Sequence, residues 1–212
     1  MSEYEQQKFV RQILEDVLEA LPGAILIGGW ATWLRTGGPM SHDIDLIVDR
    51  ADLAVVGDLT DDLSESRHIA RRKWRATWRG VHLDLYVPYQ SVLGSRLALR
   101  TENLADYAEV YDGHRMLGID AHIATKMEAL LGRERSATGQ KDRIELRQLL
   151  QLGGSGTPGV LRNASPRSPE ELADLVAEAF QYLTGGNGPD RQERNQLRAM
   201  AAEWAASLRD GG

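Results

Sequence analysis

The sequence contains no cysteine, which excludes disulfide bonds and thiolate-ligated zinc sites. No apolar run is long enough to cross a membrane, and the stretch from Ser2 to Glu5 is polar and acidic, unlike a signal peptide. We therefore expect a cytoplasmic protein with no membrane partner. None of the five histidines has the His-Glu-x-x-His spacing of a zinc hydrolase, so the sequence does not support zinc chemistry.

Positive charge is also scarce. The chain of 212 residues has a formal net charge of −6 and a pI near 5.4. This excludes a protein that coats nucleic acid regardless of sequence, because such binding needs a basic surface that displaces counterions. Residues 67–79 are an exception, with six Arg or Lys and no acid. The sequence therefore leaves room for a local basic patch.

The most informative stretch is Ile27-Gly28-Gly29, followed after thirteen residues by Asp43-Ile44-Asp45-Leu46. Side chains alternate across a strand, so Asp43 and Asp45 share one face while their apolar neighbours enter a core. Two carboxylates at one place repel each other unless a cation lies between them, and Mg²⁺ binds through one or two carboxylates plus substrate phosphates. A helix that opens after the glycines would present N–H groups to an anion. Together these features predict a site for a nucleoside triphosphate, although each alone is more often a tight turn or a solvated strand.

A β-hairpin is expected from residues 68–78 and 81–87 around Arg79-Gly80, where the glycine supplies the positive φ of the turn. With a two-residue loop, the pairs that share one face are Lys73 with Tyr86, Arg75 with Asp84 and Thr77 with His82. Arg71, Lys73 and Arg75 then lie on the face of Asp84. Either this basic face follows the backbone of an RNA, or it only protects an edge strand from aggregation.

The order of these motifs resembles the polymerase-β-like nucleotidyltransferase superfamily, in which the third acid, here Asp84, lies on a neighbouring strand. Two downstream segments are similar to the branch of AbiEii- and MenT-type toxins, namely the stretches from Lys126 to Arg133 and from Lys141 to Leu146. Glu145 departs from the pattern, because the family more often has Asp there. The resemblance covers residues 25–150 and implies an α+β fold, a polymerase-β-like nucleotidyltransferase core with a mixed sheet followed by a helical C-terminal region.

By this resemblance, the protein moves a nucleotide from an NTP to RNA, with tRNA as the expected acceptor. It would act as the toxin of a toxin–antitoxin pair, with an antitoxin protein as a partner. Two Mg²⁺ ions, or Mn²⁺ in their place, would be held by Asp43, Asp45 and Asp84. Asp84 could also take the proton of the acceptor hydroxyl.

The resemblance also assigns residues that bind the nucleotide, which are Gly28, Gly29, Ser41, Lys126 and Arg133. Lys126 would contact the triphosphate as a point charge and, like Asp142, belong to the catalytic set. Three of these residues also have a purely structural alternative. Lys126 could be an exposed helical lysine, Arg133 could pair with Glu128 or Glu134, and Asp142 could only favour the first turn of its helix.

Residues 1–117 are expected to form the catalytic domain and residues 118–212 a helical domain with a Gly/Ser/Pro linker near 153–168. Further expectations are a helix over 104–111, Asp120 as a helix cap, a helix over 141–152, a capping box at Ser168 and a last helix over 190–208. Two other functions stay open. One is nucleotidylation of a small hydroxylated molecule such as an aminoglycoside, and the other is a catalytically silent module that binds an NTP or a partner.

Overall fold

The computed structural model describes residues 3–38, 40–60, 62–66, 73–133, 136–185 and 188–210. It has the predicted α+β architecture, with a mixed sheet and a helical C-terminal region. The chain forms two compact units. The sheet unit consists of Met1–Val92 and Leu104–Gly118, and the helical unit consists of Leu93–Asn103 and Ile119–Gly212.

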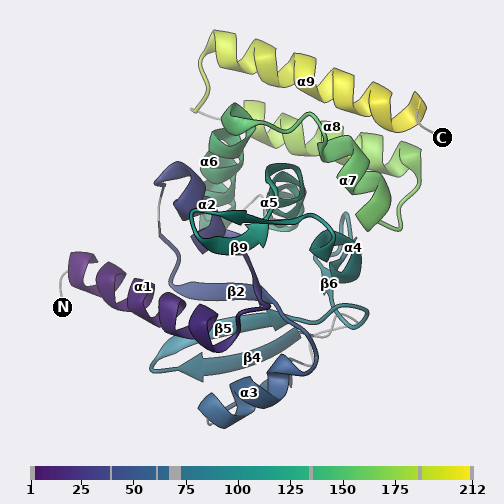
Figure 1. The fold of residues 1–212 in the computed structure, drawn as a ribbon. Coiled ribbons are helices and arrows are strands. Elements are labelled where there is room, and N and C mark those ends of the chain that lie inside the picture. Colours follow the sequence, from purple (N-terminus) through teal and green to yellow (C-terminus); the bar gives the residue numbers. More distant parts are fainter. Residues whose placement is uncertain are drawn as a thin grey trace. The chain divides into compact units, whose positions relative to one another are not determined.

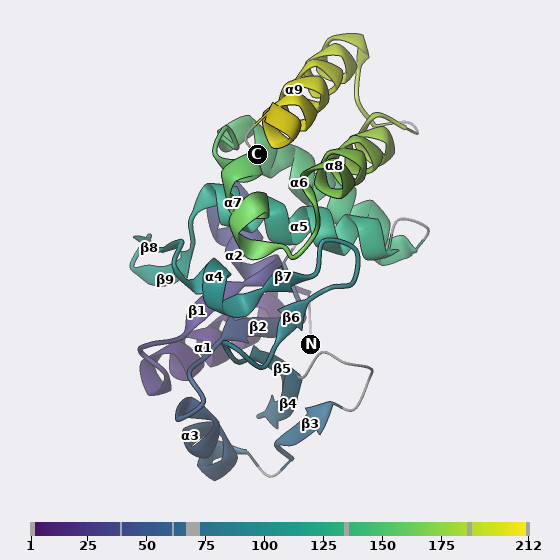
Figure 2. The ribbon, with the colours of Figure 1, turned by 90° about the vertical axis from the view of Figure 1, so that its right-hand side faces the viewer.

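The strands of the sheet unit are β1 (Ile25–Ile27), β2 (Asp43–Ile47), β3 (Ser64–Ser66), β4 (Lys73–Trp78), β5 (Val81–Tyr86), β8 (Ala108–Tyr111) and β9 (His114–Leu117). They pair in the order β3-β4-β5-β2-β1-β9-β8. Figure 1 shows β2, β5 and β4 in that order, and Figure 2 shows β4 between β3 and β5. β2 runs parallel to β5 and β1 runs parallel to β9, whereas the other neighbours are antiparallel. The predicted mixed sheet is thereby confirmed, and β2 lies near its centre.

One face of this sheet is a hydrophobic core. Ile44, Leu46, Leu83 and Leu85 are fully buried on β2 and β5, as the alternation of the sequence predicts. The apolar stripes of α1 (Glu3–Ala20) and α3 (Asp52–Leu59) pack into the same cluster. Each such side chain stabilises the fold by about 1.5–3 kcal/mol when it leaves water. The polar side chains of β2 and β5 are consequently confined to the opposite face.

The hairpin of β4 and β5 forms as predicted. Arg79 and Gly80 have φ values of 48° and 84°, the two positive values that a two-residue hairpin loop requires. The register pairs Arg75 with Asp84. The described part of the first strand begins at Lys73, so the predicted residues before it, Arg71 among them, lie outside the described residues. β3, which borders β4, was not predicted.

The helix predicted over residues 104–111 is wrong. A short helix, α4 (Thr101–Ala105), is followed by the antiparallel strands β8 and β9. Asp112 and Gly113 have φ values of 48° and 80° and form the loop between these strands. Asp-Gly is among the strongest hairpin signals, and it outweighs the weak helical spacing of the apolar residues.

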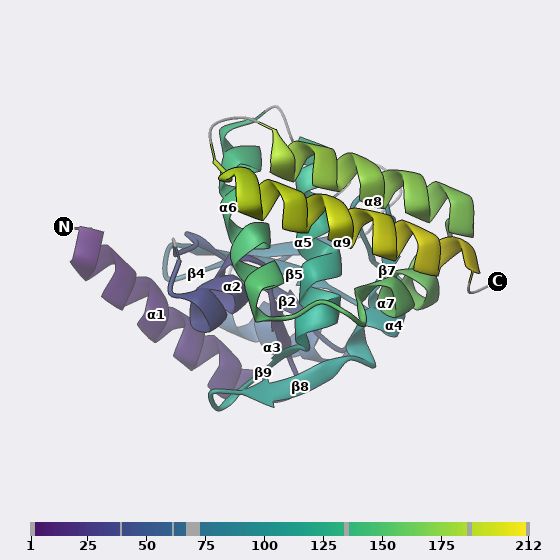
Figure 3. The same ribbon diagram turned by 90° about the horizontal axis from the view of Figure 1, so that it is seen from above.

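The helices of the helical unit are α5 (Ile119–Arg133), α6 (Ala137–Leu152), α7 (Thr157–Ala164), α8 (Pro169–Thr184) and α9 (Arg191–Asp210). Figure 3 shows α8 and α9 side by side, and Phe180 meets Trp204 edge-to-face between them, with ring centroids 5.3 Å apart. The capping box predicted at Ser168 is present, because the Ser168 hydroxyl and the Glu171 carboxylate accept each other's backbone N–H groups. β6 (Val92–Leu93) and β7 (Leu99–Arg100) form a separate small ribbon. No helix in the described part of the chain could span a membrane.

Three expectations for this unit need correction. Asp120 is not the cap of its helix, because α5 begins at Ile119 and Asp120 lies in its first turn. Its carboxylate accepts hydrogen bonds from the Gly156 N–H (2.9 Å) and the Thr157 hydroxyl (3.2 Å). α6 begins at Ala137 and not at Lys141, since Ser136 supplies the cap. The linker predicted near 153–168 contains the helix α7, whose apolar side is buried.

Candidate functional site

The predicted carboxylates of the sheet unit project from one face of β2 and β5. Asp45 is the register partner of Asp84 on the neighbouring parallel strand, and Asp43 is the partner of His82. Residues two positions apart on a strand point the same way, so these four side chains form a compact polar square. Arg75 on β4 extends it, because Arg75 lies directly opposite Asp84.

The glycine turn and the acidic strand are physically coupled. Gly28 has a φ of 71°, and a Cβ atom placed on it would lie 2.2 Å from Oδ2 of Asp45. No side chain fits there, so glycine is required both by the backbone angle and by the carboxylate. Gly28 is also the first residue of α2 (Gly28–Thr36), which begins directly after β1. The N-terminus of this helix is thereby held next to Asp45.

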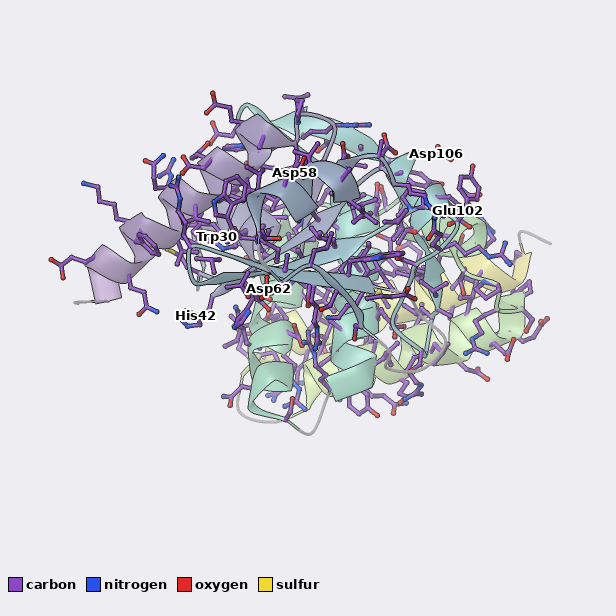
Figure 4. The ribbon with its side chains drawn as sticks, turned by 90° about the horizontal axis from the view of Figure 1, so that it is seen from below. Trp30, His42, Asp58, Asp62, Glu102 and Asp106 are labelled. Atoms are coloured by element: carbon purple, nitrogen blue, oxygen red, sulfur yellow. The ribbon has the colours of Figure 1, made fainter. Side chains whose placement is uncertain are left out.

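Trp30 fixes α2 to the core of the sheet unit. Its side chain is fully buried, and it meets Trp33 edge-to-face at 5.5 Å between ring centroids. Figure 4 shows Trp30 among other side chains and His42 at the surface near the start of β2. The turn at Gly28 is therefore held by packing on the side away from the carboxylates.

Ser41 orients the first carboxylate. Its buried hydroxyl donates a hydrogen bond to Oδ1 of Asp43 at 2.5 Å, whereas Asp43 itself is exposed. Sequence reasoning predicted Ser41 as a nucleotide ligand. The structure gives it a contact with Asp43, and direct contact with a nucleotide stays a prediction.

Asp84 is ion-paired with the hairpin. Nζ of Lys73 lies 2.5 Å from Oδ2 of Asp84, and Nε of Arg75 lies 3.3 Å from Oδ1. The Lys73 ammonium is also 5.8 Å from the centre of the Tyr86 ring. Two of the residues predicted to bind RNA therefore contact a predicted metal ligand.

The donor set suits a hard divalent cation, because Asp43, Asp45 and Asp84 supply carboxylate oxygens from one face. Within the described ranges, however, no three carboxylate or imidazole groups stand close enough together to hold a metal ion. The ion pairs of Asp84 with Lys73 and Arg75 give a physical reason, since they hold its carboxylate toward β4. The three carboxylates are suitable ligands for Mg²⁺, and the strand register places them on one face. Asp84 could bind the ion only if its contacts with Lys73 and Arg75 were released.

Sequence reasoning placed His82 and Thr77 on this face but gave them no function. Nδ1 of His82 lies 3.4 Å from the Thr77 hydroxyl, and His82 is the neighbour of Asp43 across the strands. The Thr77 N–H donates to Asp62 at 2.6 Å, and hydrogen bonding from Thr77 lowers the pKa of the Asp62 carboxyl. An imidazole beside the acids was visible from the register alone, since His82 and Asp84 are two residues apart.

The predicted residues of the helical unit form a buried charge network. Lys126 is 5% exposed, with its Nζ 2.6 Å from Oε2 of Glu145 and 4.0 Å from Oδ1 of Asp142. Nη2 of Arg133 lies 3.0 Å from Oδ2 of Asp142. Burial raises the pKa of the Asp142 carboxyl, and the charges of Arg133 and Lys126 oppose that rise.

These contacts correct three structural alternatives. Lys126 is not an exposed helical lysine. Arg133 contacts Asp142 and not Glu128, whereas Glu134, the other expected partner, lies outside the described residues. Asp142 lies beyond the first turn of α6, because that helix starts at Ala137, so the helix dipole does not explain its position. Glu145, which departs from the family pattern, keeps a carboxylate within contact of Lys126.

A buried carboxylate that sequence reasoning missed is Glu128 on α5. It accepts hydrogen bonds from the backbone N–H groups of Ser95, Arg96 and Leu97. A Cβ atom on Gly94, where φ is 68°, would lie 1.7 Å from Oε1 of Glu128. Glu128 therefore holds the segment that begins at Gly94, and the only sequence signal was an acid within the apolar pattern of a helix.

The predicted site residues belong to two sets. Asp43, Asp45 and Asp84 lie in the sheet unit, with Gly28, Gly29 and Ser41, whereas Lys126, Arg133 and Asp142 lie in the helical unit. The structure brings the members of each set together within their own unit.

No protein-family model matches the chain, and no curated protein matches it. Several solved structures are similar. An antigenic nucleotidyltransferase-like protein from Paracoccidioides brasiliensis has 17% identity and a TM-score of 0.46, over 95% of this chain and 94% of that one. ANT(2″)-Ia in complex with adenylyl-2″-tobramycin has 16% identity and a TM-score of 0.47, over 71% of this chain and 94% of that one. JHP933 from Helicobacter pylori has 16% identity and a TM-score of 0.43, over 100% of this chain and 96% of that one.

Proposed function

We propose that the protein is a metal-dependent nucleotidyltransferase whose reaction takes place on the polar face of β2 and β5. The observation that carries this proposal is the joint placement of Asp45 beside Asp84 and directly against Gly28. A purely structural strand has no need for adjacent carboxylates on one face, since like charges on neighbouring strands destabilise a sheet. A divalent cation with a bound triphosphate would remove that cost.

Asp43, Asp45 and Asp84 would hold the Mg²⁺ or Mn²⁺ ions, which when bound would neutralise the triphosphate and acidify the acceptor hydroxyl. The acceptor oxygen forms a bond to the α-phosphorus, and the bond from that phosphorus to the α–β bridging oxygen breaks. Pyrophosphate leaves, and the hydroxyl proton passes to a carboxylate of this face, for which Asp84 is our candidate. The N–H groups at the start of α2 lie beside Asp45, where they would bind a phosphate oxygen.

For the acceptor we propose RNA, with tRNA as the first candidate, and a role as the toxin of a toxin–antitoxin pair. The support for this choice is the resemblance of the segments around Lys126 and Asp142 to AbiEii- and MenT-type toxins. Their burial with Glu145 gives these motifs at least a structural role. Contact of Lys126 and Arg133 with the triphosphate remains part of the proposal.

A small hydroxylated acceptor is the second candidate, and one observation favours it. Lys73 and Arg75, two of the three residues predicted to follow an RNA backbone, are ion-paired with Asp84. A chain of net charge −6 in which Lys73 and Arg75 are already paired offers a polynucleotide less attraction than the sequence suggested.

Purified protein with Mg²⁺ and each α-labelled NTP should transfer label to total tRNA, and this transfer should fall steeply as the salt concentration rises. Binding to a polyanion releases counterions, so a salt dependence is expected for RNA and not for a neutral small acceptor. Aminoglycosides are the matched small acceptors. Label on an aminoglycoside alone would select the second candidate, and absence of label on every acceptor would contradict the proposed activity.

Gly28→Ala should lower nucleotidyl transfer by about a hundredfold, because the new methyl group must displace the Asp45 carboxylate and a shift of about 1 Å can cost that much. Gly37→Ala is the control at the other end of the same helix. Gly37 also has a positive φ, 65°, but a Cβ atom placed on it would meet no described atom within 4 Å, so the change adds strain without touching Asp45. Thermal midpoints and transfer rates of both variants are the measurement. Equal activity of the two variants would disprove the coupling of the turn to Asp45.

A further inference from the structure

Both carboxylate oxygens of Asp84 are bound by cations of its own sheet. Lys73 contacts Oδ2 at 2.5 Å and Arg75 contacts Oδ1 at 3.3 Å. The side chains of Lys73 and Asp84 are only 22% and 18% exposed, so water and salt screen their interaction less than that of a surface pair. Asp43, by contrast, accepts a hydrogen bond from the neutral hydroxyl of Ser41.

We propose that Lys73 and Arg75 form an electrostatic latch on Asp84, which a divalent cation must displace before Asp84 can bind it. The proposal rests on the proposed function, since it concerns the same metal site. An ammonium group and a divalent cation that share one carboxylate oxygen repel each other at close range. The metal therefore competes with the latch for Asp84.

The two cations act on Asp84 to different degrees. Lys73 is the more sheltered and the closer, whereas the Arg75 side chain is 55% exposed. Lys73 lies diagonally from Asp84 across the strands, a distance that a long side chain can bridge, and Arg75 lies directly opposite. Removing Lys73 should therefore affect metal binding more than removing Arg75.

The test is the affinity for Mn²⁺, followed by the electron paramagnetic resonance signal of the free ion. Lys73→Gln should tighten Mn²⁺ binding about threefold to tenfold, the effect of losing a sheltered ion pair. Arg75→Gln should change the affinity in the same direction and by less. Arg79→Gln is the matched control, because it removes a cation of the same hairpin that pairs with Asp16, and it should leave the affinity unchanged.

A double-mutant cycle separates the latch from a general effect of charge. In an Asp84→Asn background, Lys73→Gln should no longer tighten Mn²⁺ binding, because the contested carboxylate is gone. Thermal midpoints confirm that each variant is folded, and Arg75→Gln serves in place of Lys73→Gln if the latter does not fold. Unchanged or weaker Mn²⁺ binding by Lys73→Gln would overturn the latch.

Asp45→Asn distinguishes failure of the latch from failure of the proposed function. If wild type binds Mn²⁺ and Asp45→Asn does not, the metal site exists whatever the hairpin variants do, and an unchanged Lys73→Gln then refutes the latch alone. If neither wild type nor Lys73→Gln combined with Arg75→Gln binds Mn²⁺, both the latch and the metal-dependent function are refuted.

Discussion

Asp45→Asn is expected to lower the rate of nucleotidyl transfer by about three orders of magnitude and to leave the fold intact. The neutral amide has the shape of the carboxylate but lacks its negative charge, so it would hold a divalent cation beside Asp84 much more weakly. The apolar side of β2, with Ile44 and Leu46, is untouched by the change. Incorporation of labelled nucleotide at saturating Mg²⁺ and NTP measures the effect.

The matched control is Asp49→Asn, which removes an exposed carboxylate just beyond the end of β2. This variant should retain activity and stability, because surface substitutions away from a site change little. Near wild-type turnover by Asp45→Asn would refute catalysis on this face of the sheet.

Lys126→Met is expected to destabilise the helical unit by about 3–5 kcal/mol, the usual cost of leaving a buried charge without its partner. Glu145 is fully buried and receives its shortest ion pair, 2.6 Å, from Lys126. Native-state hydrogen exchange of the α5 and α6 amides measures the free energy of opening of this unit. Lys141→Met is the control, because the partly exposed Lys141 lies 3.7 Å from the other oxygen of Glu145 and should contribute less than about 1 kcal/mol.

Combining Lys126→Met with Glu145→Met should recover most of the lost stability, because apolar residues of similar volume replace a buried ion pair at little cost. The double variant then shows what Lys126 does for the nucleotide. If Lys126 binds the triphosphate, the refolded double variant has a raised KM for NTP and an unchanged KM for the acceptor. An unchanged KM for NTP would make Lys126 a structural residue only. Equal stability of Lys126→Met and Lys141→Met would refute the network itself.

The sheet side of the site could be predicted because its determinants are local. Alternation along the strand separates Asp43 and Asp45 from the core, and the two-residue loop at Arg79-Gly80 fixes the partner of every residue on β4 and β5. Next to Asp112-Gly113 the prediction was wrong, because a helix was expected over residues 104–111 and the turn signal outweighs that helical spacing. What the register could not give was the state of Asp84. Its Oδ2 atom is bound by Lys73 from a diagonal position, which depends on side-chain conformation and not on spacing.

The helical side was harder because its contacts are between helices. Lys126 and Glu145 are 19 positions apart, and no periodic rule links them. The burial of Asp142 depends on where α6 begins. Ser136 sets that start, because its hydroxyl oxygen accepts a hydrogen bond from the Gly139 N–H. Glu128 looked like one more surface acid, since its partners are backbone groups of a segment more than thirty residues earlier.

The segment held by Glu128 has a consequence for how the chain is made. Residues 93–103 lie between two parts of the sheet unit in sequence, yet they belong to the helical unit, so the polypeptide passes between the units three times. During synthesis, the N–H groups of Ser95 and Arg96 leave the ribosome well before the carboxylate that accepts them. A nascent chain that ends near residue 118 contains every strand of the sheet. Its residues 93–103, however, would still lack Glu128, which accepts hydrogen bonds from their N–H groups. The sheet unit can therefore be completed before the helical unit during synthesis. Neither unit is encoded by one continuous stretch of the gene.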